Sequence, residues 1–149
     1  MLASAYFIGY SIGASMYFLP DKIGRKKSVM LSFGLSLLAQ SVLVAYQSIL
    51  VCSVCMFLLG FSSIKNSQTY VWSTDCVPLR RRPDVITIIN IVDALPALTL
   101  GFWFLVVGSD WFTYAVFMLA INYLAFILGI FCPESPRWLL VNDRKAEAI

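Results

Sequence analysis

Lys65 and Asp93 are the two charged residues that lie well inside long apolar stretches of the sequence. A charge at the centre of a lipid bilayer costs at least about 2.5–3.5 kcal/mol, so such residues usually pair or line a water-filled path. Lys65 lies ten residues before Asp75, and Asp93 lies ten residues after Pro83. At about 1.5 Å per helical residue, both charges lie about 15 Å from the same end of neighbouring helices. We therefore expect an intramembrane ion pair that faces the interior of a helical bundle.

The alternative interpretation of Lys65 and Asp93 is a polar pathway through the bundle. Four amides in the same stretches would line it with them: Asn66, Gln68, Asn90 and Asn122. The sequence leaves open whether this set serves structure alone or a passage for a polar solute.

A second group of charges lies at the ends of the apolar stretches. Its acids and bases are Asp21, Arg25, Asp75, Arg82, Glu134 and Arg137. Exposed ion pairs contribute only about 0–1 kcal/mol each. A cluster at a tight helix junction can contribute more, because its side chains are already partly ordered. We expect an ion-pair network at one membrane face, and the alternative is that the basic residues only fix the topology.

Other reactive residue types give little sign of chemistry. Cys52 and Cys55 have a C-x-x-C spacing, which can mark redox or metal sites. They fall one turn apart on an apolar stretch with no second pair, so we interpret them as small hydrophobic residues in a helix interface. The sequence has no histidine, no obvious acid pair and no phosphate-binding loop. We predict no enzyme activity, no catalytic residue, no metal and no cofactor.

The composition places these residues in a membrane. Of the 149 residues, 60% are hydrophobic and 13% are charged, against about 25% charged in soluble domains. Lipid cannot hydrogen-bond the backbone, so apolar stretches of about 20 residues must be helices. Five such stretches cover roughly residues 2–19, 28–46, 49–72, 85–107 and 111–132. The fold class is therefore predicted as an all-α, polytopic membrane bundle of five transmembrane helices in residues 1–132, followed by a tail at 133–149.

The connections between these stretches differ in charge. Ten of the 11 basic residues lie on alternate connections or on the tail, and the remaining one is Lys65. Five antiparallel spans place those connections on one side, which the positive-inside rule makes cytoplasmic. We expect a multi-pass protein with its N-terminus outside and its C-terminus in the cytoplasm.

Three motifs carry a family resemblance. Residues 19–26 read LPDKIGRK and resemble the signature loop of the major facilitator superfamily, which joins its second and third helices. Residues 75–82 resemble the E-x-x-P-x-x-x-R-G motif at the cytoplasmic end of the fourth helix. Residues 133–140 read PESPRWLL and resemble the motif after the sixth helix in the sugar-porter and organic-cation branches.

The resemblance implies that the chain corresponds to helices two to six of a twelve-helix transporter, a half bundle without its first helix. It implies movement of a small polar solute, a sugar or an organic cation, by alternating access. It also implies that the charge network latches the cytoplasmic helix ends in one conformation.

Some residues depart from the family pattern. Tyr17 stands where the loop motif has its first glycine, and Met56 stands where the fourth helix often has an arginine. The alternative is therefore a degenerate, transporter-derived accessory or structural subunit without transport activity of its own. The expected partners are the lipid bilayer, the missing transporter half or other membrane subunits, and a small polar solute if the protein is active; nucleic acid is not expected.

Overall fold

The structure, a computed structural model, describes residues 2–16, 18–46, 48–108 and 110–141. The side chains of Leu19, Asp21, Leu140 and Val141 lie outside this description. Within the described ranges the regular elements are all helical. Their bounds are α1 Leu2–Ser15, α2 Leu19–Ile23, α3 Arg25–Ala45, α4 Ile49–Ser62, α5 Ile64–Asp75, the 3-10 turn η1 Leu79–Arg81, α6 Arg82–Val106, α7 Trp111–Phe131 and α8 Pro136–Val141. The prediction of an all-α polytopic bundle is thus confirmed.

Four helical stretches are long and apolar enough to cross a membrane. They are Arg25–Ala45, Ile49–Asp75, Leu79–Val106 and Trp111–Phe131. The first predicted stretch, 2–19, is shorter as a helix, because α1 has 14 residues and ends at Ser15. Pro20 lies in the first turn of the next helix, α2, where its ring is tolerated.

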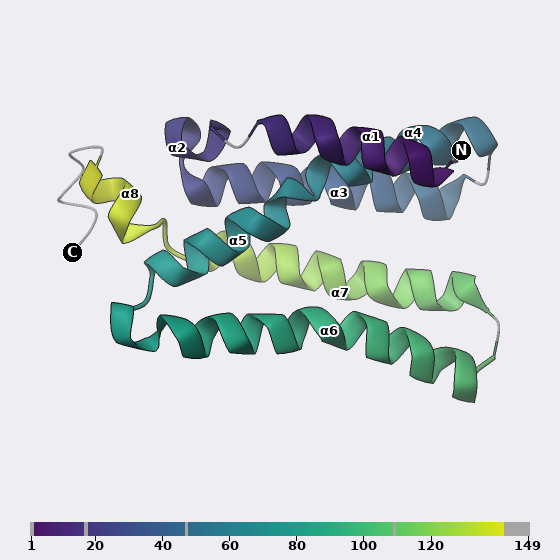
Figure 1. The fold of residues 1–149 in the computed structure, drawn as a ribbon. Helices are drawn as coiled ribbons and strands as arrows, with labels where there is room; N and C mark the ends of the chain where they lie inside the picture. The colour runs from purple at the N-terminus through teal and green to yellow at the C-terminus, as the bar shows by residue number, and fades with distance from the viewer. Residues whose placement is uncertain (1, 17, 47, 109, 142–149) are drawn as a thin grey trace.

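The predicted 49–72 helix is divided into α4 and α5. The division falls at Ser63, whose N–H donates to the carbonyl of Gly60 at 3.2 Å. The hydroxyls of Ser62 and Ser63 donate to carbonyls three residues earlier, at 3.1 and 2.6 Å. Such serine bonds to the preceding turn often bend helices, and α5 accordingly runs obliquely to α4 (Figure 1).

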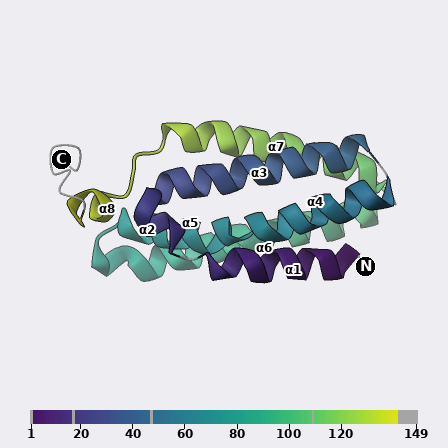
Figure 2. The ribbon, with the colours of Figure 1, turned by 90° about the horizontal axis from the view of Figure 1, so that it is seen from above.

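The helices form two layers that run along one common direction (Figures 1 and 2). Helices α1, α3 and α4 make one layer, α6 and α7 make the other, and α5 crosses between them. Helix α3 contacts α4, α5 and α7, and α6 contacts α5. Helices α2 and α8 and the α5–α6 turn lie at one end, which we call the basic end because the arginines of η1 and the lysines of α2 and α3 are there. No described residue of α6 or α7 is buried.

Helices α1 and α4 cross most closely, at glycines. A methyl group on Gly9 would fall against the backbone carbonyl of Phe57, and one on Gly60 would fall against that of Tyr6. Small residues at membrane helix interfaces let two backbones approach in this way. This crossing holds α1 against α4, in the same layer as α3 and its polar side chains.

Candidate functional site

Asp75 is the centre of a charge cluster at the basic end. Its side chain is only 3% exposed and forms an ion pair with Arg25 at the first position of α3. Arg137, which is 66% exposed, places its Nη1 atom 3.7 Å from the other carboxylate oxygen. The cluster therefore joins the C-terminus of α5 to the N-terminus of α3 and to α8.

Ser135 connects the same carboxylate to the last helix. Its side chain is fully buried, and its hydroxyl lies 3.3 Å from Asp75 Oδ2 as a donor. The Ser135 hydroxyl oxygen also accepts the backbone N–H of Trp138 at 3.3 Å. A serine oxygen that accepts an N–H from the first turn is the usual N-terminal cap of a helix. Ser135 thus holds α8 and the ion pair together.

The Glu134 carboxylate caps the start of α3. Its Oε1 atom accepts the backbone N–H of Lys26 at 2.7 Å and that of Ser135 at 3.3 Å. The residue before α3 is Gly24, which has no side chain to cap the helix and has a positive φ of 112°. The first N–H groups of a helix lack partners inside it and attract negative charge. Glu134 supplies both the acceptor and the charge.

Two members of the predicted network stand apart from this cluster. Arg82 forms no ion pair with a described side chain, and its Nε atom is buried without a hydrogen-bond partner. The side chain of Asp21 lies outside the described residues. The structure therefore brings together Arg25, Asp75 and Arg137 and places Glu134 beside them.

A stripe of polar residues runs along α3 inside the bundle. Its members are spaced by four: Ser28, Ser32, Ser36 and Gln40. Ser28 donates to Gln68 Oε1 at 2.9 Å, and this contact is buried. Ser36 accepts a short hydrogen bond from the Lys65 ammonium, which also lies 4.9 Å from the centre of the Phe33 ring. Two of the predicted polar residues of α5, Gln68 and Lys65, thus bond to this stripe.

Helix α7 meets the same stripe further along. The Asn122 side-chain nitrogen donates to Gln40 Oε1 at 3.3 Å and to the carbonyl of Met118 at 3.1 Å. Next to them, the hydroxyls of Ser41 and Tyr123 lie 2.8 Å apart. Asn122 therefore has a partner on α3 within the bundle.

Tyr70 on α5 joins two of the predicted residues on α6. Its hydroxyl lies 2.8 Å from Asn90 Oδ1 and 2.7 Å from Asp93 Oδ2. One hydroxyl proton can be donated fully to only one acceptor. No described lysine or arginine forms an ion pair with Asp93. We call these three residues the acidic cluster; it has more acceptor oxygens than donors, which favours a ligand that brings a positive charge or an N–H group.

The expected ion pair between Lys65 and Asp93 is absent from the described residues, because each has another partner. Lys65, on α5, bonds to Ser36 of α3, whereas Asp93, on α6, bonds to Tyr70 of α5. The two charged groups therefore lie on different sides of α5. Asn66 is exposed, and no hydrogen bond of its side chain to a described residue is present. The alternative, a polar pathway, stays a prediction.

Sequence reasoning missed several partners of these residues. They are Tyr70, Ser28, Ser36, Gln40 and Ser135. The four-residue spacing of the α3 stripe was a readable signal, since residues four apart share a helix face. Tyr70 carried no such signal, because an aromatic residue in an apolar helix is ordinarily a packing residue.

The cysteines make no disulfide among the described residues, and no group of three potential metal ligands occurs there. Cys76 follows Asp75 at the basic end. Burial raises the pKa of the Cys76 thiol above its ordinary value, and Cys132 and Glu134 nearby add to the rise. A thiol with a raised pKa is a weak nucleophile near neutral pH.

Membrane-length helices joined by hydrogen bonds between their polar side chains define a multi-pass membrane protein. The chain belongs to the sugar (and other) transporter family, whose model matches residues 1–149. It is 31% identical over 158 aligned residues to the organic cation/carnitine transporter 6 of Arabidopsis thaliana. That alignment covers 100% of this chain and 30% of the relative, so the chain spans less than a third of the relative's length. The predicted resemblance to the sugar-porter and organic-cation branches of the major facilitator superfamily is confirmed.

Proposed function

We propose that the chain is part of a facilitator that moves a small organic cation across a membrane by alternating access. The name of the Arabidopsis relative supports an organic cation or carnitine over a sugar. In transporters built from repeats, the solute site lies near the membrane midplane between the repeats.

The acidic cluster of Tyr70, Asn90 and Asp93 is the observation that carries this proposal. Asp93 lies eleven residues into α6, a helix of 25 residues, and so near its middle. A carboxylate at such a depth needs a cation, which no described residue of this chain supplies. The ring of Tyr70 lies beside it, and an aromatic face adds to the binding of quaternary ammonium groups. A cationic solute would complete the cluster.

The Asp75 cluster would serve as the latch of the cycle. Arg25, Asp75 and Ser135 connect α3, α5 and α8 at the basic end, so the helix ends are held together while these bonds last. Alternating access requires two arrangements of the helix ends, one with these bonds formed and one with them broken. Breaking the Arg25–Asp75 pair would be the step between the two. The basic end faces the cytoplasm in this proposal, by the positive-inside rule.

The test is uptake by liposomes that contain the purified chain, with tetraethylammonium and carnitine as the labelled probes. The proposal expects saturable uptake of at least one probe, which Asp93→Asn removes. Asp84→Asn is the matched control, because Asp84 lies in the first turn of α6, is exposed and is remote from the cluster. Loss of uptake in both variants, or in neither, would contradict the role of Asp93.

The second candidate function is an accessory subunit derived from a transporter, with no transport of its own. The departures from the family pattern at Tyr17 and Met56 favour it. It predicts that the chain purifies with other membrane subunits and that liposomes containing it take up no more probe than protein-free liposomes. Uptake that depends on Asp93 would exclude it.

A further inference from the structure

A pocket at the basic end lies between the start of α3, the end of α7 and α8. Its volume is about 440 Å³, and it opens to the surface of the bundle. Its polar wall comes from Lys26 and Lys27, and its apolar wall comes from Met30, Phe126 and Ile130. Trp138 on α8 also lines the pocket.

The two walls lie at different depths along the helices. The lysines are in the first turn of α3, and Met30 lies one turn further in. On α7, Ile130 lies next to the last residue, and Phe126 lies one turn further in. One turn is about 5.4 Å along the axis, so the pocket changes from charged to apolar in the direction of the membrane interior. Such a gradient fits an amphipathic ligand.

The net charge of the pocket is positive. Its acid, Glu134, is already engaged by two backbone N–H groups, those of Lys26 and Ser135. The Lys26 ammonium donates one bond, at 2.8 Å, to the carbonyl of Ile130 and keeps two further N–H donors. Lys27 is exposed, and its side chain makes no hydrogen bond or ion pair with a described residue. Both ammonium groups can therefore receive an anion.

We propose that this pocket binds a phospholipid with a negatively charged headgroup. The lysines take the phosphate, the apolar wall takes the upper acyl chains, and Trp138 lies at the level of the headgroups, where tryptophan is enriched. Basic pockets between membrane helices bind such headgroups, and each lysine contributes about 1 kcal/mol near an anionic surface. A free inorganic anion would make no contact with the apolar side chains of Met30 and Phe126. This site is separate from the acidic cluster and does not depend on solute transport.

The test measures quenching of Trp138 fluorescence by brominated lipids added to the purified chain in mild detergent. The contribution of Trp138 is obtained by subtracting the signal of the Trp138→Phe variant, since three other tryptophans are present. Brominated phosphatidylglycerol should quench at lower concentration than brominated phosphatidylcholine, and excess inorganic phosphate should not displace it. Equal quenching by the two lipids, or displacement by phosphate, would overturn the proposal.

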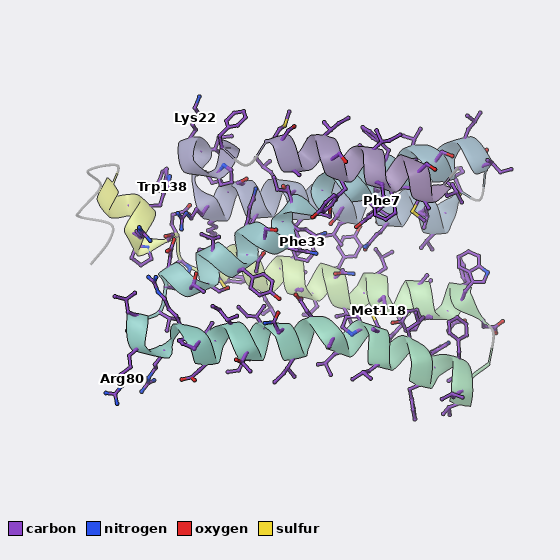
Figure 3. The ribbon with its side chains drawn as sticks, viewed as in Figure 1. Phe7, Lys22, Phe33, Arg80, Met118 and Trp138 are labelled. Carbon is purple, nitrogen blue, oxygen red and sulfur yellow. The ribbon has the colours of Figure 1, made fainter. Side chains whose placement is uncertain are left out.

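Lys27→Gln should lower the preference for phosphatidylglycerol about fivefold, which corresponds to about 1 kcal/mol. Lys22→Gln is the matched control, because Lys22 is also an exposed lysine at the basic end but extends away from the pocket (Figure 3). Equal losses in the two variants would show general attraction to the charged end and refute a specific site. If Lys27→Gln fails to fold, the salt dependence of lipid binding by the native chain still tests the proposal. A preference for phosphatidylglycerol over phosphatidylcholine that does not weaken at high salt would contradict binding through the lysines.

Discussion

The Glu134 carboxylate accepts a 2.7 Å hydrogen bond from the backbone N–H of Lys26, 108 residues earlier in the chain. This contact gives the glutamate of the PESPR sequence a definite task, the capping of α3 across the bundle. It ties the end of the last long helix to the start of the helix that contacts α4, α5 and α7.

Glu134→Ala should therefore destabilise the bundle by about 1 kcal/mol, the usual cost of losing a helix cap. Glu134→Gln keeps an acceptor oxygen but loses the charge that the helix terminus attracts, so its cost should be smaller. The midpoint of thermal unfolding in detergent measures both. A Glu134→Ala chain as stable as the original would show that solvent caps α3 equally well.

Asp75→Asn should be far more costly than any change at Arg137. Asp75 is nearly buried, and removing one partner of a buried pair costs about 3–5 kcal/mol. Arg137 is 66% exposed, so Arg137→Gln should cost no more than about 1 kcal/mol. Unfolding of the two variants in the same detergent gives the comparison. Similar losses from both would mean that the ion pair is screened by water despite its burial.

Much of the fold could be predicted because lipid imposes simple rules on length and polarity. The apolar stretches predict the helices, and the proline and glycine around Asp21 mark the turn between α1 and α3. The division at Ser63 could not be predicted, since it depends on serine hydroxyls that donate to backbone carbonyls only in the folded helix.

The partners of Lys65 and Asp93 could not be predicted from the sequence. Depth along a helix is readable from residue number, and it places Lys65 and Asp93 at similar heights. Pairing also depends on which side of α5 each residue faces, and the neutral partners Ser36 and Tyr70 decide that. Arg82 shows the same limit, because a motif position does not specify the partner.

Gly60→Ala should weaken the crossing of α1 and α4. The added methyl group would meet the backbone carbonyl of Tyr6, which cannot rotate away, so a loss of about 1–3 kcal/mol is expected. Gly101→Ala is the matched control on α6, where the methyl group has open space and alanine is the better helix former. It should be neutral or stabilising. Equal stability of the two variants in thermal unfolding would refute the close crossing.

Ser28→Ala should cost about 1 kcal/mol, because it leaves the buried Gln68 side chain without its donor. Hydrogen bonds between membrane helices average only about 0.6 kcal/mol, so a much larger loss is not expected. The double variant Ser28→Ala with Gln68→Leu should recover most of it, since neither polar group then remains. Ser32→Ala on the same stripe is the control, because no hydrogen bond of its side chain to a described residue is present. Additive losses in the double variant would argue against the bond.

The thiol of Cys76 should react slowly with a maleimide at neutral pH. Its pKa is raised above the ordinary value of 9.0 by burial and by Cys132 and Glu134, so less thiolate is present than in glutathione at the same pH. In a chain that keeps Cys76 alone, burial and Glu134 still raise the pKa of this thiol, so the labelling rate should rise about tenfold per pH unit until the pH passes the raised pKa. A rate equal to that of glutathione at pH 7 would contradict the raised pKa.

Two single-cysteine chains, one that keeps Cys76 and one that keeps Cys52, test which way the bundle lies in the membrane. Cys76 is at the basic end, whereas Cys52 lies in the first turn of α4, at the opposite end (Figure 1). If the basic end faces the cytoplasm, as the positive-inside rule requires, a charged maleimide that cannot cross the membrane should label Cys52 in intact cells. It should label Cys76 only after the membrane is opened, and the labelling must be run above pH 8 for long enough to offset the slow thiol. Labelling of Cys76 in intact cells would reverse the orientation, and with it the side on which the Asp75 latch and the lipid pocket lie.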